Sequence, residues 1–180
     1  MQRRLRAGFG ALLLAALILP SSGAQAADRS WQCAPFARMF SGLQLFGAAK
    51  SWWQQAVGKY GQGHTPTEGA VLVFKAMGSM RSGHVATVSK VVGDRMIKVT
   101  HANWSPINGR RGQVERDVTV IDTSSAGDWS RVRVWYAPIK GLGTTDYPTF
   151  GFIYGDNAPS EAPSEAAIAA RPETTDASAS

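Results

Sequence analysis

The chain has 180 residues, a formal net charge of +6 and a single cysteine, Cys33. This length suits one folded domain with a core of its own. One cysteine excludes an internal disulfide framework, so the thiol is a buried apolar group, an intermolecular link or a reactive group. The basic charge favours an anionic partner but supports no particular fold or ligand.

The first 26 residues have the pattern of a secretory signal peptide. Three arginines precede a short apolar run at 11–20, and an A-x-A cleavage site ends at Ala26. The apolar run is shorter than the roughly 20 residues that a membrane-spanning helix needs. We therefore predict a signal peptide at 1–26 and an exported mature protein, in the periplasm or the medium, with no integral membrane span. Export also disfavours nucleic acid as the anionic partner.

Two helices followed by several strands are expected in the mature chain. The helices are predicted at 30–42 and 50–57, and Pro35, which is tolerated only in a first helical turn, places the start of the first helix near Cys33. Apolar and β-branched runs predict strands at 70–74, 85–92, 95–100, 114–121, 132–136 and 149–154. This order predicts an α+β domain over 27–154. Residues 155–180 are rich in Ala, Pro, Ser and Glu and are expected to form a disordered tail.

The segments on either side of Gly93-Asp94 have the pattern of a β-hairpin. With a two-residue turn at this position, His84 faces Asn103 across the hairpin, and His101 is the diagonal neighbour of His84. The middle of the face that carries these residues is apolar. We expect a helix to cover this face and a polar site to lie at the open end of the hairpin.

The residues near this open end satisfy the requirements of a cysteine hydrolase. Such an enzyme needs a nucleophilic thiol, a histidine base and a third polar group that orients the histidine. Cys33 at a helix start and His84 at a strand start are the predicted nucleophile and base, and the register favours Asn103 over His101 as the orienting residue. The backbone N–H of Cys33 is the expected oxyanion donor, with the side chain of Gln32 as a second donor.

Four segments, in order, resemble a CHAP domain, the cysteine- and histidine-dependent amidohydrolase/peptidase group related to the NlpC/P60-type papain-like enzymes. They are 32–37 (QCAPFA), 69–74 (GAVLVF), 83–86 (GHVA) and 101–104 (HANW). The resemblance, over 31–136, implies a papain-like fold in which N-terminal helices carrying the cysteine pack on an antiparallel sheet carrying the histidine. It implies that Cys33 and His84 cleave amide bonds of peptidoglycan.

The resemblance leaves the orienting residue open. Many members of the family carry an acidic residue at the position of His101, whereas the wider superfamily also uses histidine there. Both His101 and Asn103 therefore stay candidates. Trp104, which follows them, is a candidate for the wall of the substrate pocket, and a place in the core is equally compatible with its sequence position.

Neither a metal nor a cofactor is expected, because the spacing of Cys33 and the histidines matches none of the usual zinc-ligand pairs. Two other functions stay open: a catalytically idle cell-wall-binding or scaffold domain, and a protein-directed cysteine protease or acyl transferase of the same fold. The sequence specifies neither the peptidoglycan bond that is cut nor the oligomeric state.

Overall fold

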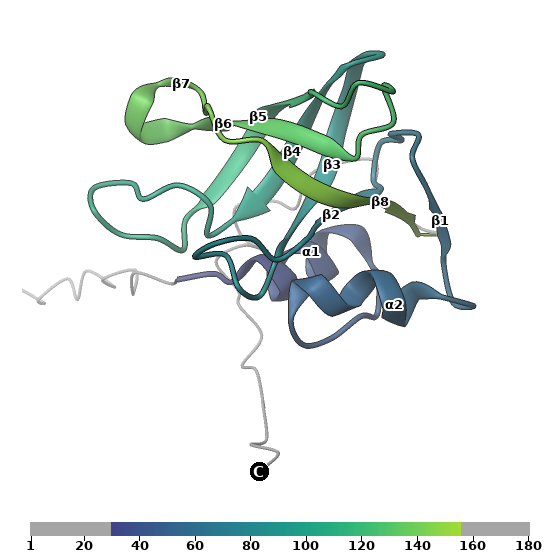
Figure 1. The fold of residues 1–180 in the computed structure, drawn as a ribbon. Helices are drawn as coiled ribbons and strands as arrows, with labels where there is room; N and C mark the ends of the chain where they lie inside the picture. Colours follow the sequence, from purple (N-terminus) through teal and green to yellow (C-terminus); the bar gives the residue numbers. More distant parts are fainter. Residues whose placement is uncertain (1–29, 156–180) are drawn as a thin grey trace, which may run out of the picture.

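The computed structural model describes residues 30–155, in which two short helices precede a set of antiparallel strands (Figure 1). The helices are α1 (Cys33–Ser41) and α2 (Trp52–Ala56), and the short 3₁₀ helices are η1 (Ala49–Ser51) and η2 (Ala137–Ile139). The strands are β1 (Gly61–Gly63), β2 (Val71–Phe74), β3 (His84–Gly93), β4 (Met96–Ala102), β5 (Val114–Asp122), β6 (Arg131–Tyr136), β7 (Gly141–Leu142) and β8 (Tyr147–Tyr154).

The strands close into a barrel because β8 pairs on two sides. The sheet order is β1-β8-β2-β3-β4-β5-β6-β7, and β8 pairs in addition with β6. The strands β2, β3, β4, β5, β6 and β8 thus form a closed ring, and β1 and β7 are extra strands. Gly151 allows β8 to bend through these pairings, since it has a φ of 127° and a Cβ there would collide with the carbonyl oxygen of Gly63.

The predicted fold class is therefore wrong. The domain is not an α+β papain-like fold with helices packed on an open sheet; it is mostly β, built on a closed antiparallel barrel. The two helices are short, with nine residues in α1 and five in α2. The strand segments were predicted nearly correctly, but their closure depends on the pairing of β6 with β8, which local sequence patterns do not reveal.

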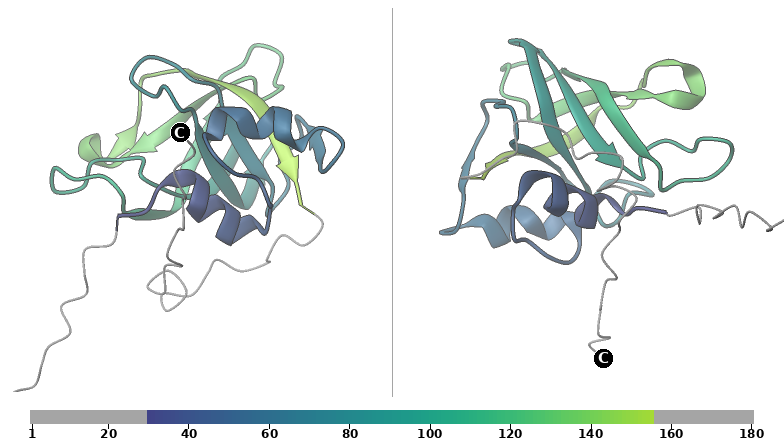
Figure 2. Two further views of the ribbon diagram at one scale, coloured as in Figure 1. Left: turned by 90° about the horizontal axis from the view of Figure 1, so that it is seen from below. Right: turned by 180° about the vertical axis from the view of Figure 1, so that it is seen from behind.

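Both helices pack on one side of the barrel (Figures 1 and 2). The strand β2 is buried on both faces: Leu72 and Phe74 lie in the barrel core, whereas Val71 and Val73 contact the helices. The apolar face of the β3–β4 hairpin lines the barrel interior. The prediction that a helix covers this face is wrong, because the helices cover the opposite face, through residues such as Val85.

The local elements around the site follow the sequence closely. The helix α1 begins at Cys33, as Pro35 in its first turn predicts, and ends at Gly42, which adopts a φ of 75° and donates its N–H to the carbonyl of Arg38. In the hairpin, Thr87 pairs with Thr100, as the predicted register requires. Two register shifts nearer the tip move the turn by one residue, to 94–95.

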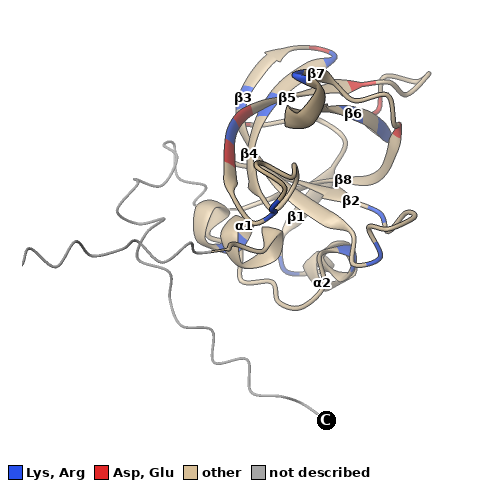
Figure 3. Cartoon of the chain, turned by 90° about the vertical axis from the view of Figure 1, so that its left-hand side faces the viewer, with Lys and Arg blue, Asp and Glu red and all other residues tan. Residues whose placement is uncertain are grey.

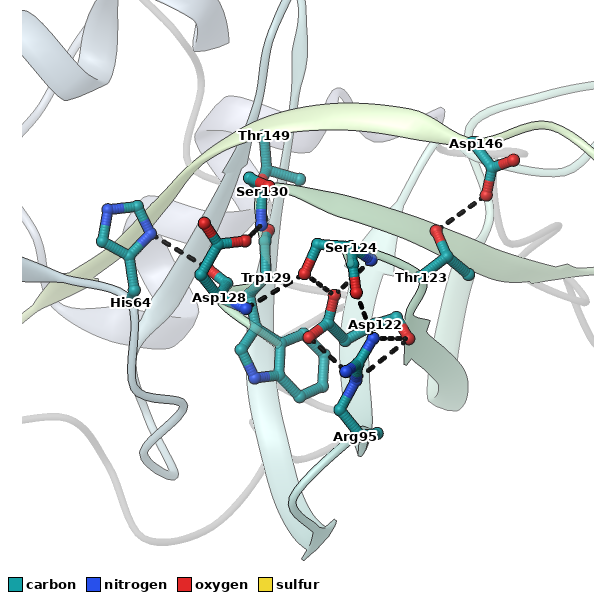
Figure 4. A network of polar contacts seen from close by, with 10 residues as sticks. All are labelled: His64, Arg95, Asp122, Thr123, Ser124, Asp128, Trp129, Ser130, Asp146 and Thr149. Atoms are coloured by element: carbon teal, nitrogen blue, oxygen red, sulfur yellow. Dashed lines mark hydrogen bonds and ion pairs between the residues drawn. The ribbon is translucent and has the colours of Figure 1, made fainter. Parts of the chain in front are cut away.

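A polar network connects the hairpin turn with the segment between β5 and β6 (Figure 4). Arg95, in the hairpin turn, forms an ion pair with Asp122 at 3.0 Å and also donates to the carbonyl of Ser124. Nδ1 of His64 lies 3.0 Å from the backbone oxygen of Asp128. These contacts hold the segment between β5 and β6, and they account for His64 as a residue of this network rather than of the candidate site.

The predicted signal peptide at 1–26 and the predicted tail at 155–180, apart from Gly155, lie outside the described residues. Among the helices of residues 30–155, none has the length and apolar composition needed to cross a membrane.

Candidate active site

Cys33 is the first residue of α1, and its thiol is a free, partly buried group. Burial raises the pKa of this thiol above its ordinary value, while backbone hydrogen bonds from Val85, Ala34 and Cys33 itself act in the opposite direction. The contact with Val85 places the sulfur beside the first residues of β3, where His84 lies. The helix start alone therefore does not ionise the thiol, and proton transfer to a base is needed.

His84, the first residue of β3, is held by His101 from β4. Nε2 of His84 lies 3.0 Å from Nδ1 of His101, and both rings are buried. This contact occupies Nε2 of His84 and leaves Nδ1 as the nitrogen available to accept a proton from a thiol. The structure thus brings His84 together with His101, the candidate that the predicted register had placed farther away.

Both histidines are neutral at neutral pH because they are buried. Burial and, as the smaller cause, the positive charge of Arg111 lower the pKa of His84 to about 3. Burial likewise lowers the pKa of His101 well below its ordinary value, with His84 as the second cause. Arg111 is near the site because the next residue, Gly112, accepts a hydrogen bond from the N–H of Trp31 at 2.8 Å, two residues before Cys33. A neutral imidazole is the form that can act as a general base.

The side chain of Asn103 forms its hydrogen bond with Gln32 and not with His84, although the pairing at this end of the hairpin has the predicted register. The strand β4 ends at Ala102, and Asn103 adopts a left-handed conformation with a φ of 65°, which asparagine tolerates better than most residues. This turn directs its side-chain amide to Gln32, where Nδ2 donates to Oε1 at 2.8 Å. Asn103 therefore holds the residue that precedes Cys33 and leaves the side-chain N–H groups of Gln32 as donors.

Trp104 forms the inner wall behind the two histidines. Its ring centroid lies 4.9 Å from that of His84 and 5.6 Å from that of His101, stacked on the latter. The indole N–H donates to the backbone oxygen of Trp135 at 3.2 Å, and the side chain belongs to the barrel core. Trp104 thus shields the histidine pair from water on the core side; its contact with a substrate stays a prediction.

The sequence analysis missed Glu115 on β5, whose carboxylate oxygen Oε1 lies 4.0 Å from Nε2 of His101. No local signal identifies it, since a long connection separates β4 from β5 and the sequence does not fix their register. Among residues 30–155, no three His, Cys, Asp or Glu side chains are arranged to hold a metal ion.

Comparison with known proteins gives one result that bears on this arrangement. The family model of the CHAP domain matches residues 24–103, a range that includes Cys33, His84, His101 and Asn103. No curated protein matches the chain. The match confirms the resemblance that the four segments predict. Residues 24–103 therefore match the CHAP domain family, whose members are generally hydrolases of the amidase and peptidase type.

Proposed function

We propose that this chain is an exported cysteine hydrolase that cleaves amide bonds of peptidoglycan. The observation that carries the proposal is the juxtaposition of three residues. Cys33 begins α1 with its sulfur at the backbone of Val85, and the neighbouring His84 is hydrogen-bonded to His101. The CHAP match supports the hydrolase class, and peptidoglycan is the substrate that the resemblance implies.

In the proposed reaction, Sγ of Cys33 attacks the carbonyl carbon of the amide while Nδ1 of His84 accepts the thiol proton. The backbone N–H of Cys33 and the side-chain amide of Gln32 donate to the oxyanion that forms. His84 then returns the proton to the leaving amine as the C–N bond breaks, and a thioester forms on Cys33. A water molecule that gives a proton to His84 attacks this thioester, releases the carboxylic acid and restores the thiol.

The charge of the domain supports an anionic polymer as substrate. Lys and Arg outnumber Asp and Glu in residues 30–155, and Figure 3 shows them at several separate places around the chain. Peptidoglycan carries carboxylates on its peptides, so a basic domain is attracted to it over several ångströms. The signal peptide predicted at 1–26 supports a workplace in the periplasm or outside the cell.

A digest of purified peptidoglycan tests the proposal directly. The purified protein is incubated with the polymer, and the soluble fragments are analysed by mass spectrometry, which also identifies the bond that is cut. We expect fragments with new amino and carboxyl groups from the wild type and none from Cys33→Ala. An absence of fragments from the wild type, or equal release by Cys33→Ala, contradicts the proposal.

One observation favours a second candidate, a catalytically idle wall-binding domain. Burial raises the pKa of Cys33, as expected of a structural cysteine. Alkylation with iodoacetamide at pH 7 separates the two candidates. If the chain is a hydrolase, Cys33 should be alkylated at least about tenfold more slowly in His84→Gln than in the wild type, because the base no longer removes the thiol proton. Equal alkylation rates in the wild type and in His84→Gln, together with binding to peptidoglycan without cleavage, identify the idle domain.

A further inference from the structure

A β-bulge places a carboxylate opposite the histidine that orients His84. On the β4–β5 ladder, Val99 pairs with Val118, whereas His101 pairs with Glu115, so the register shifts by one residue between the two pairs. Without this shift, Arg116 instead of Glu115 would be opposite His101. Asp117, which lies in the shifted segment, has a φ of 51°. Bulges of this kind redirect side chains next to functional sites.

Glu115 is buried, with 8 % of its surface exposed, and its contacts fix where its charge lies. Oε1 accepts the backbone N–H of Ser105 at 2.7 Å and lies 4.0 Å from Nε2 of His101. That nitrogen is buried and has no hydrogen-bond partner among the described residues, since its 4.0 Å separation from Glu115 exceeds a hydrogen-bond length. Burying a carboxylate is costly unless it has compensating partners, so its position against His101 requires an explanation.

We propose that Glu115 is a positioning residue that acts through His101 to fix the tautomer of His84 and to stabilise the positive charge that His84 acquires. The inference rests on the proposed function, because it assigns His84 as the base. A carboxylate favours a proton on Nε2 of the ring that faces it. Nδ1 of His101 is then an acceptor, so the proton of His84 lies on Nε2, and Nδ1 of His84 is free to take the proton of Cys33.

The charged and titratable groups around His84 come from four segments. Cys33 lies on α1, His101 on β4 and Glu115 on β5, and Arg111 lies in the connection between β4 and β5. Arg111 disfavours a positive charge on His84, whereas the carboxylate of Glu115 favours it. Arg111 and Glu115 therefore have opposite effects on the protonation of His84, and only Glu115 acts through a neighbouring ring, that of His101.

The substitution Glu115→Gln tests the role with little change of shape. Because Oε1 of Glu115 both accepts the N–H of Ser105 and lies toward Nε2 of His101, the glutamine oxygen can keep both positions, and the substitution removes only the negative charge. A neutral amide oxygen favours a proton on Nε2 of His101 less than a carboxylate does, so part of the molecules shifts to the tautomer with Nδ1–H on both rings, in which His84 has no lone pair toward Cys33. Glu68→Gln is the matched control, because it makes the same change at an exposed residue near the hairpin.

Histidine ring ¹⁵N NMR reads the tautomers, since the chain has three histidines and single substitutions assign them. In the wild type we expect Nε2–H on both His84 and His101, and in Glu115→Gln a shift toward Nδ1–H on both. Wild-type signals that place the proton of His101 on Nδ1 overturn the proposal even if Glu115→Gln does not fold. Unchanged tautomers in a folded Glu115→Gln overturn it too.

The alkylation rate of Cys33 gives a second readout, and it distinguishes a failure of the proposed function from a failure of the role of Glu115. We expect Glu115→Gln to slow alkylation at pH 7 by about tenfold, the equivalent of one pKa unit, and Glu68→Gln to leave it unchanged. A wild type that is alkylated no faster than His84→Gln contradicts the proposed function. A wild type that depends on His84 but reacts at the same rate as Glu115→Gln contradicts the role of Glu115 alone.

Discussion

Lowering the pH from 7.5 to 5.0 should destabilise this fold, because it buries two histidines in their neutral form. His84 is 3 % exposed and His101 0 %, and burial is the main cause that lowers the pKa of each, to about 3 for His84. In the unfolded chain both rings take up a proton near the ordinary pKa of about 6.5. Since the folded-state pKa is the lower one, this stabilisation is complete above about pH 6.5 and is lost as the pH falls toward 3.

The magnitude follows from the gap between the two pKa values. At pH 5.0 the unfolded state gains about 2 kcal/mol from protonation of each ring, while the folded state gains almost nothing. The pair therefore lowers the free energy of unfolding by about 4 kcal/mol, a large part of the roughly 5–15 kcal/mol that stabilises a typical domain. Protonation of carboxylates adds its own pH dependence, so the effect of the histidines must be obtained by difference.

Urea unfolding at pH 7.5 and 5.0, followed by tryptophan fluorescence, measures this difference. The stability lost between the two pH values should be about 4 kcal/mol larger in the wild type than in the double variant His84→Gln/His101→Gln. His64→Gln is the control, because the ring of His64 is exposed, and it should behave like the wild type. If the double variant loses as much stability as the wild type, the two rings are not held neutral by burial, and the reasoning fails.

Three further predictions concern single residues. Arg111→Gln should raise the pKa of His84, because it removes a positive charge near the ring; a histidine ring NMR titration that shows no change contradicts this. Asn103→Gly keeps the left-handed conformation but loses the amide that holds Gln32, so kcat on peptidoglycan should fall by about tenfold at unchanged KM, and an unchanged kcat refutes the role. Gly151→Ala should lower the free energy of unfolding by about 2 kcal/mol or more. The control Gly93→Ala, where a Cβ meets no atom within 4 Å, should change it by less than about 0.5 kcal/mol. Equal urea midpoints for the two variants contradict the requirement for glycine in β8.

The sequence predicts the parts of the site that depend on local chemistry. Pro35 limits the start of α1 to the neighbourhood of Cys33, and the hairpin pattern gives the pairing of Thr87 with Thr100, close to the histidines. Both signals act over a few residues, where proline geometry and side-chain alternation are strong. The closed barrel and Glu115 were not predictable in this way. The first depends on a bend at Gly151, and the second on a one-residue bulge whose place no hydrophobic pattern marks.

The backbone conformation of Asn103 explains the division of roles in the site. A strand that continued through residue 103 would place Asn103 opposite His84, but the positive φ of Asn103 ends β4 one residue earlier. As a result the side-chain amide of Asn103 donates a hydrogen bond to Gln32, and His101 is the side chain that contacts His84. An orienting imidazole has a second nitrogen, so it can pass on the influence of a charge behind it, which an amide bonded to Gln32 does not do for His84. The left-handed turn at Asn103 and the bulge that follows Glu115 on β5 therefore have complementary effects: the first leaves the orienting role to a histidine, and the second places a carboxylate opposite that histidine.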